Sequence, residues 1–174
     1  MKHFLVVVDI QNDFVNGALG SKEAEAIIAP ACEKIKNFDG EIIVTFDTHF
    51  EDYLTTAEGK KLPVEHCIKG TNGWQLNPDV LKSLEGKKYE KVEKLTFGST
   101  SLPSLIKVLA DNDDFDITLI GLCTDICVVS NALILKANFY DKNIMVDAAC
   151  CAGVTVDSHN AALTTMQMCQ IEII

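Results

Sequence analysis

Short apolar runs alternate along this chain with segments of helical spacing, and this alternation constrains the fold more than any other feature. The expected strands are residues 4–8, 41–47, 89–93, 117–121, 143–147 and 171–174. Several of these runs are continuous stretches of Val, Ile and Leu, which is typical of parallel strands buried on both faces. The alternation predicts an α/β fold: a doubly wound, mostly parallel sheet with helices on both faces, in three layers.

The segments between these runs predict the helices and loops. Helices are expected at 21–35, 78–84, 101–112 and 125–138 and from about 157, with loops at 11–17, 48–77 and 148–153. Ser21 is the expected N-cap of the first helix, whose apolar positions are Ala24, Ile27, Ile28, Ala31 and Ile35. The inner side of the last helix is expected to carry Ala161, Ala162, Thr165, Met166 and Cys169. A chain of 174 residues predicts a single domain, 1–174, in which the polar loop at about 48–77 is long enough to be functional.

Charge and cysteine usage exclude several classes of protein. The net charge of −10 argues against nucleic acid or an anionic membrane surface as the main partner, since both need basic patches. No apolar run has the length of a membrane span, and we expect a cytoplasmic protein. Seven cysteines, an odd number without C-x-x-C spacing, indicate reduced thiols rather than a disulfide scaffold.

Residues that can carry chemistry follow the expected strands. Asp9, Asp47 and Lys94 end the first three strands, and Cys127 lies just beyond the fourth, at the start of a helix. The carboxyl ends of parallel strands open onto one crevice, so these groups can converge. Backbone N–H groups at a helix start lower the pKa of a thiol and offer donors to an oxyanion. The pattern favours Cys127 as a nucleophile, with Asp9 as its proton acceptor and Lys94 as an electrostatic bridge.

Each of these residues also has a purely structural explanation. Cys127 is compatible with a buried small apolar residue, the aspartates with caps of the next segment, and Lys94 with a solvated surface cation. A nucleotide- or flavin-binding module on a similar sheet is a different class of function. It lacks support, because no G-x-G-x-x-G or G-x-x-x-x-G-K-[ST] motif follows any strand.

Four segments resemble, in the same order, motifs of the isochorismatase-like cysteine hydrolases, and within them the nicotinamidases. They are Val-Val-Asp-Ile-Gln-Asn-Asp-Phe at 7–14, Lys-Leu-Thr-Phe-Gly-Ser at 94–99, Gly-Leu-Cys-Thr-Asp-Ile-Cys-Val at 121–128, and Ser-His-Asn-Ala-Ala-Leu-Thr-Thr-Met at 158–166. The resemblance implies an amidohydrolase of pyridine nucleotide salvage that converts nicotinamide to nicotinate and ammonia through a cysteine thioester. Another small amide or carbamoyl compound is the alternative substrate, whereas isochorismate is not favoured.

The resemblance also implies the catalytic residues. It implies a triad of Asp9, Lys94 and Cys127, with an oxyanion hole formed by the backbone N–H groups of Cys123 and Cys127. It further implies a cis peptide between Leu122 and Cys123 and self-association into a homo-oligomer. The substrate pocket is expected to be lined by Phe14, Phe97 and Leu122.

A divalent metal is expected beside the triad. Asp47-Thr-His49 places two possible ligands on one side of an extended segment, and His66 lies beyond the loop. Such a set suits zinc, iron or manganese, although hydrogen bonds within the loop are an alternative role for these side chains. By resemblance the metal is most often zinc and binds the pyridine nitrogen of the substrate. Glu58 resembles a glutamate that some members use as a further ligand, and Leu62-Pro63 stands where an aromatic residue is usual.

Overall fold

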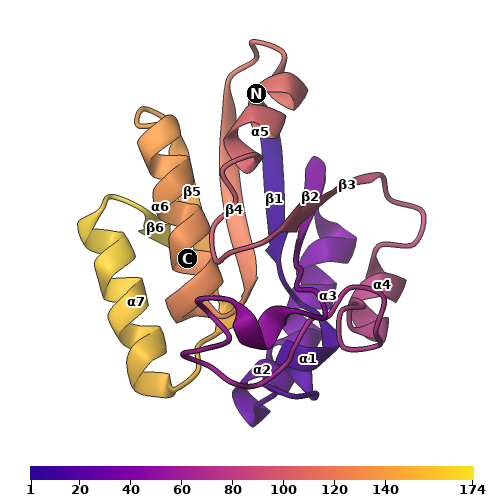
Figure 1. The fold of residues 1–174 in the computed structure, drawn as a ribbon. Helices are drawn as coiled ribbons and strands as arrows, with labels where there is room; N and C mark the ends of the chain where they lie inside the picture. The colour runs from indigo at the N-terminus through magenta and orange to yellow at the C-terminus, as the bar shows by residue number, and fades with distance from the viewer.

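A six-stranded, entirely parallel sheet forms the centre of the protein in the computed structural model, which describes residues 1–174 (Figure 1). The strands are β1 (Lys2–Val8), β2 (Glu41–Asp47), β3 (Tyr89–Lys94), β4 (Phe115–Leu122), β5 (Asn143–Ala152) and β6 (Glu172–Ile173). Their order across the sheet is β3-β2-β1-β4-β5-β6, and every neighbouring pair is parallel. All six predicted strands are present.

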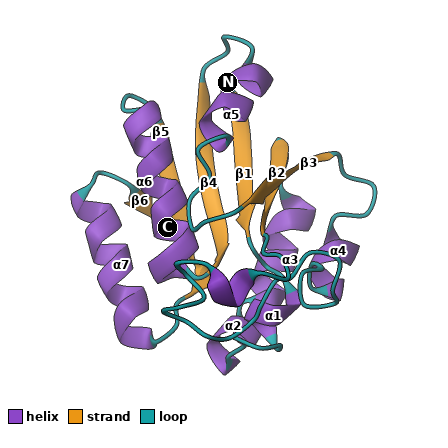
Figure 2. Cartoon of the chain, in the orientation of Figure 1, coloured by secondary structure: helices purple, strands orange, loops and turns teal.

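Helices cover both faces of this sheet, as the doubly wound prediction requires (Figure 2). Helices α1 (Asn12–Val15), α2 (Lys22–Ala26), α3 (Ile28–Asn37) and α4 (Pro78–Ser83) pack on one face, and α5 (Leu102–Ala110), α6 (Val129–Asn138) and α7 (Val156–Met168) on the other. Successive side chains of a strand point to opposite faces. Leu5 and Val7 therefore belong to one hydrophobic core, and Phe4, Val6 and Val8 to the other.

The first expected helix is present but divided at Ile27. Ser21 caps α2, since its Oγ accepts the N–H of Ala24 at 3.0 Å. Pro30 has no N–H to give to the carbonyl of Ala26, so the helical ladder is interrupted there. The predicted apolar face is nevertheless buried along its whole length: Ala24, Ile27, Ile28, Ala31 and Ile35.

Three local predictions were wrong. The expected loop at 11–17 contains the single helical turn α1, and the expected loop at 148–153 is strand as far as Ala152. β5 continues there because it rejoins β4 beyond a bulge, where the register shifts between Leu119 and Gly121. In α7 only Ala162 and Met166 are buried. Ala161, Thr165 and Cys169 are exposed, because the helix presents a narrow edge to the sheet.

The strand order places a switch point between β1 and β4. The chain proceeds from β1 toward β3 on one side and from β4 toward β6 on the other. In open α/β sheets ligands bind in the crevice beyond the carboxyl ends of the strands at such a point. Asp9 follows β1 there, and Cys123 follows β4.

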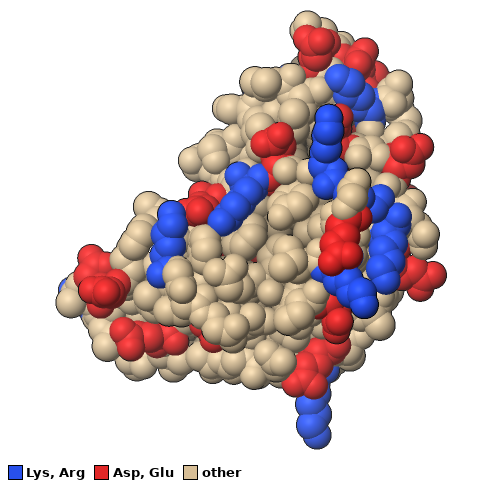
Figure 3. Space-filling model, turned by 90° about the vertical axis from the view of Figure 1, so that its right-hand side faces the viewer, with Lys and Arg blue, Asp and Glu red and all other residues tan.

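The surface and the helix lengths bear on possible partners. On the face shown in Figure 3, acidic and basic side chains are interspersed and form no continuous basic patch. None of the helices is both long enough and apolar enough to cross a lipid bilayer.

Candidate active site and metal centre

The ammonium group of Lys94 connects the polar groups at the strand ends. Its Nζ lies 2.6 Å from Oδ2 of Asp9, 3.1 Å from Oδ1 of Asp47 and 3.5 Å from Sγ of Cys127. All four residues are buried, with Lys94 only 4% exposed. Residues far apart in the sequence thus converge at one point, because β1, β2, β3 and β4 end at the same edge of the sheet.

Asp9 is held in a fixed orientation by Thr45 on the neighbouring strand. Its backbone is left-handed, with φ of 47°, a conformation that aspartate tolerates better than most residues. The Oγ1 of Thr45 accepts the N–H of Asp9 at 3.2 Å and donates to its Oδ1 at 2.6 Å. Oδ2 lies 2.6 Å from Nζ of Lys94, and the Asp9 carboxyl is within side-chain hydrogen-bonding reach of the Cys127 thiol. The carboxylate is therefore placed to accept the thiol proton.

Burial and charge set the protonation states at this point. Burial raises the pKa of the Cys127 thiol well above its usual value, the Asp9 carboxylate adds to this, and Lys94 opposes it. For Lys94, burial disfavours the charge, but the surrounding Asp9, Cys127 and Asp47 raise its pKa overall. Burial raises the pKa of Asp9, which Lys94 partly offsets. The unliganded site therefore holds a neutral thiol beside a charged ammonium.

The segment after β4 presents both the thiol and free backbone donors. The peptide between Leu122 and Cys123 is cis, as the resemblance implied. A π-helical turn, Thr124–Val128, then leads into α6, and the carbonyl of Cys123 accepts the N–H groups of Ile126 and Val128. The N–H of Cys123 donates to no acceptor within the protein. Unpaired N–H groups at a helix start can bind an anionic oxygen.

A second group of donors lies directly beside Lys94. One ligand atom from each of Asp47, His49 and His66 lies within 4.8 Å of the others, and all three residues are buried. Oδ2 of Asp47 is 3.0 Å from Nε2 of His49 and 3.6 Å from Nε2 of His66. Glu58 extends this group, since its Oε1 lies 3.7 Å from Nε2 of both histidines. Two imidazoles and two carboxylates facing a common point fit a divalent metal ion.

Hydrogen bonds prepare these donors for a metal. Nδ1 of His66 pairs with the carbonyl of Val64 at 2.8 Å, which leaves Nε2 as the nitrogen directed at Asp47. Burial opposes ionisation of Asp47, but hydrogen bonds from His49 and His66 hold the pKa of its carboxyl well below the usual range. The same hydrogen bond to Asp47 raises the pKa of His66, against the effect of burial.

Four supporting residues were missed at the sequence level. Gln11 clamps Asp47, since its side chain accepts the N–H of Asp47 at 2.8 Å and donates to its carbonyl at 2.9 Å. Tyr53 packs edge-on against His49 and His66. Asp13 accepts the N–H of Cys67 beside His66, and Thr45 orients Asp9. Only Thr45 had a usable signal: it stands two residues before Asp47, so both side chains point to the same face of β2.

Two cavities flank this cluster. One, of about 330 Å³, is lined by Phe14 and Cys123, and the other, of about 500 Å³, by His49, Glu58 and Phe97. Phe14 and Phe97, the expected pocket walls, therefore line different cavities. Leu62 and Ile126 line both cavities and separate them. Leu122 is fully buried in the core and lines neither cavity.

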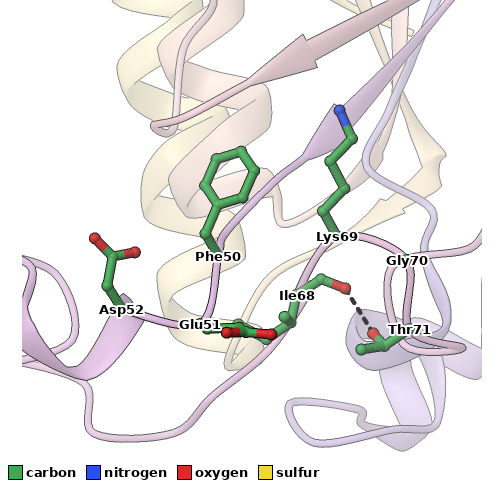
Figure 4. Close-up of a pocket in the computed structure, with 7 residues that line it drawn as sticks. All are labelled: Phe50, Glu51, Asp52, Ile68, Lys69, Gly70 and Thr71. Atoms are coloured by element: carbon green, nitrogen blue, oxygen red, sulfur yellow. Dashed lines mark hydrogen bonds between the residues drawn. The ribbon is translucent and has the colours of Figure 1, made fainter.

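A larger cavity, of about 650 Å³, lies away from the triad and the metal donors. All of its lining residues belong to the loop at 48–77, and it is formed where the segment after β2 pairs with the segment around Ile68. Phe50 and Lys69 extend to the same side of these two segments, and Thr71 Oγ1 donates to the carbonyl of Ile68 (Figure 4). None of the residues that line it belongs to the triad or to the metal donors. We therefore assign the chemistry to the smaller cavities.

The chain is similar in sequence and in fold to known proteins. The sequence matches the isochorismatase domain family over residues 3–174. A nicotinamidase of Schizosaccharomyces pombe is 26% identical, over 98% of this chain and 91% of that protein. The crystal structure of a nicotinamidase/pyrazinamidase from Bacillus subtilis is 26% identical, with 99% of each chain covered and a TM-score of 0.78. The pyrazinamidase of Pyrococcus horikoshii, solved in complex with zinc, covers 100% of this chain and 99% of its own at a TM-score of 0.80, and its 22% identity shows a shared fold.

Proposed function

This chain is an amidohydrolase of the isochorismatase family, and we propose that it is a nicotinamidase, which hydrolyses nicotinamide to nicotinate and ammonia. One observation carries the proposal: the Lys94 ammonium touches the Cys127 thiol and also Asp47 of the metal donors. The thiol and the metal donors are therefore close enough for a substrate whose amide and metal-binding nitrogen belong to one small ring. Nicotinamide has this arrangement.

In the first half of the reaction, Cys127 acts as the nucleophile. Asp9 accepts the thiol proton as the sulfur attacks the carboxamide carbon, so the high pKa of the thiol is overcome only when substrate is present. The N–H groups of Cys123 and Cys127 bind the oxyanion that forms. The C–N bond then breaks, Asp9 returns the proton to the departing nitrogen, and ammonia leaves a thioester.

In the second half, water cleaves the thioester. Asp9, again a carboxylate, takes a proton from water as the hydroxyl oxygen attacks the thioester carbon. The same N–H groups hold the second oxyanion. The C–S bond breaks, Asp9 returns its proton to the sulfur, and nicotinic acid leaves and ionises to nicotinate. Lys94 remains charged throughout and stabilises each anionic form of Asp9 and Cys127.

Asp47, His49, His66 and Glu58 would hold a divalent metal, which we propose to be zinc, with iron or manganese as alternatives. When bound, the metal supplies a Lewis acid that can bind the pyridine nitrogen of the substrate. The zinc complex of the Pyrococcus horikoshii pyrazinamidase and the donor set both support this choice.

The assay that tests the proposal is ammonia release from nicotinamide by the metal-loaded protein. We expect Cys127→Ala to abolish release. Cys151→Ala is the matched control, because both thiols are 4% exposed and Cys151 lies in β5, outside the site. Ammonia release by Cys127→Ala, or none by the wild-type protein, would refute the proposed function.

Four further proposals accompany this assignment. Residues 1–174 act as one domain, in which 48–77 is the metal and substrate loop. The protein works in the cytoplasm as a homo-oligomer and takes part in pyridine nucleotide salvage. Light scattering on the purified protein tests the assembly state.

A further inference from the structure

Leu62 separates two cavities, and its position bears on the size of the substrates that the enzyme can accept. It lines both the cavity with Phe14 and Cys123 and the cavity with His49 and Glu58. Only Ile126 shares this property among their lining residues. Ile126 is fixed in the π-helical turn, so the partition between the cavities depends on the size of the side chain at position 62.

The backbone of Leu62 is held in place. The Tyr53 hydroxyl donates to its carbonyl at 2.9 Å, and the N–H of Val64 bonds the same carbonyl at 2.8 Å. Tyr53 is fully buried against the two metal-site histidines. The side chain at position 62 therefore has a defined location relative to the metal donors, and a larger residue there would extend into the cavities.

The space around this partition exceeds what one small aromatic ring needs. The cavities measure about 330 and 500 Å³, each within the range of sites for drug-sized ligands. The wall of the larger one is apolar on its outer side, where Leu62, Leu95 and Phe97 are 38%, 69% and 43% exposed. Apolar side chains clustered at the mouth of a cavity favour an apolar ligand group.

We propose that Leu62 is a specificity-determining residue and that the enzyme accepts nicotinamides with a bulky apolar substituent on ring carbon 5. A group on this carbon leaves both the carboxamide and the ring nitrogen accessible, and it occupies the space beside Leu62. This inference rests on the proposed function, because it assumes that the carboxamide of the substrate faces Cys127 and that its ring nitrogen faces the metal donors.

The test compares nicotinamide with 5-phenylnicotinamide as substrates of the metal-loaded enzyme. We expect the wild-type kcat/KM values to lie within about tenfold of each other, since an apolar group that fits gains binding. Leu62→Trp places a larger side chain between the two cavities. It should lower the ratio of the two kcat/KM values, 5-phenylnicotinamide over nicotinamide, by at least about tenfold. Leu81→Trp is the matched control, because Leu81 is 51% exposed on α4 and lines neither cavity. It should leave the ratio unchanged.

A binding measurement separates this inference from the proposed function. Calorimetric titration of metal-loaded Cys127→Ala with each amide reports binding without turnover. Adding Leu62→Trp to this variant should strongly weaken the binding of 5-phenylnicotinamide but not that of nicotinamide. If nicotinamide is hydrolysed but Leu62→Trp leaves the ratio and both affinities unchanged, the role of Leu62 is refuted while the function stands. If nicotinamide is neither bound nor hydrolysed, the proposed function itself has failed. Should Leu62→Trp not fold, Leu62→Phe is the substitute and carries the same expectation.

Discussion

Replacing Lys94 by methionine should destabilise the metal-free protein strongly, because it leaves a carboxylate buried without its cation. At effective dielectric constants near 20, the separations of 2.6 and 3.1 Å from Asp9 and Asp47 give gross attractions of about 6 and about 5 kcal/mol. The cost of burying the charges offsets much of this. Removal of one partner from a buried ion pair typically costs about 3–5 kcal/mol, and we expect a loss of that size in the free energy of unfolding.

The loss should depend on pH, with a definite sign. Burial already raises the pKa of Asp9 in the folded wild type, and without Lys94 only the hydrogen bond from Thr45 still opposes this effect. A folded-state pKa above the unfolded value of about 3.9 means that the folded state binds the proton more tightly. The variant then loses stability as the pH rises through the folded pKa of Asp9. Its deficit should be smaller at about pH 5 than at about pH 8.

Urea denaturation of the chelator-treated protein measures these free energies. A second substitution, Asp9→Asn, should restore part of the stability of Lys94→Met, because asparagine keeps the hydrogen bond from Thr45 and tolerates the left-handed backbone. Lys34→Met is the matched control: its ion pair with Asp147 is partly exposed, and its loss should cost about 1 kcal/mol or less. A deficit for Lys94→Met no larger than that of Lys34→Met, with no recovery on adding Asp9→Asn, would show the reasoning to be wrong.

Two further predictions address the metal donors and the central strands. His66→Ala should weaken zinc binding by at least about tenfold, since even the loss of a hydrogen bond to a metal ligand has that effect. Equilibrium dialysis measures the affinity. The control is His3→Ala, which replaces an exposed histidine paired with Asp116 and should bind zinc like the wild type. Equal affinity of the His66 variant would exclude that residue as a ligand. Gly121→Ala should lower the free energy of unfolding by about 3 kcal/mol or more, because its Cβ would lie 2.1 Å from the carbonyl oxygen of Val8 and its φ is 122°. Gly86→Ala, with φ of 77° but open space around it, should cost about 1–2 kcal/mol in the same denaturation experiment, and similar losses for both glycines would contradict the steric argument.

Periodicity in the sequence predicted the elements because burial itself is periodic. The run at 4–8 is apolar at every position, and each of these residues is fully buried between two layers of helices. Lys94 was predicted at a strand end because charged residues alternate with apolar ones up to it in β3. The family motifs then suggested which strand-end residues act together.

Features that depend on neighbouring strands were not predictable from the chain alone. The extension of β5 to Ala152 depends on a bulge in its pairing with β4, and no local sequence pattern at 148–152 predicts it. Gln11 and Asp13 have the appearance of loop residues until the metal loop folds over them. Thr165 in α7 was expected on the inner side of its helix but is exposed. Helical spacing predicts which side of a helix faces the sheet, but not how many of the residues on that side are buried.

The ammonium at the centre of the site is carried by the outermost strand. β3 pairs with β2 alone and has no neighbour on its other side. Edge strands can open at lower cost than strands inside a sheet, and detachment of β3 would withdraw Lys94 from Asp9 and Cys127. We therefore expect activity to be lost on heating before the core of the sheet unfolds.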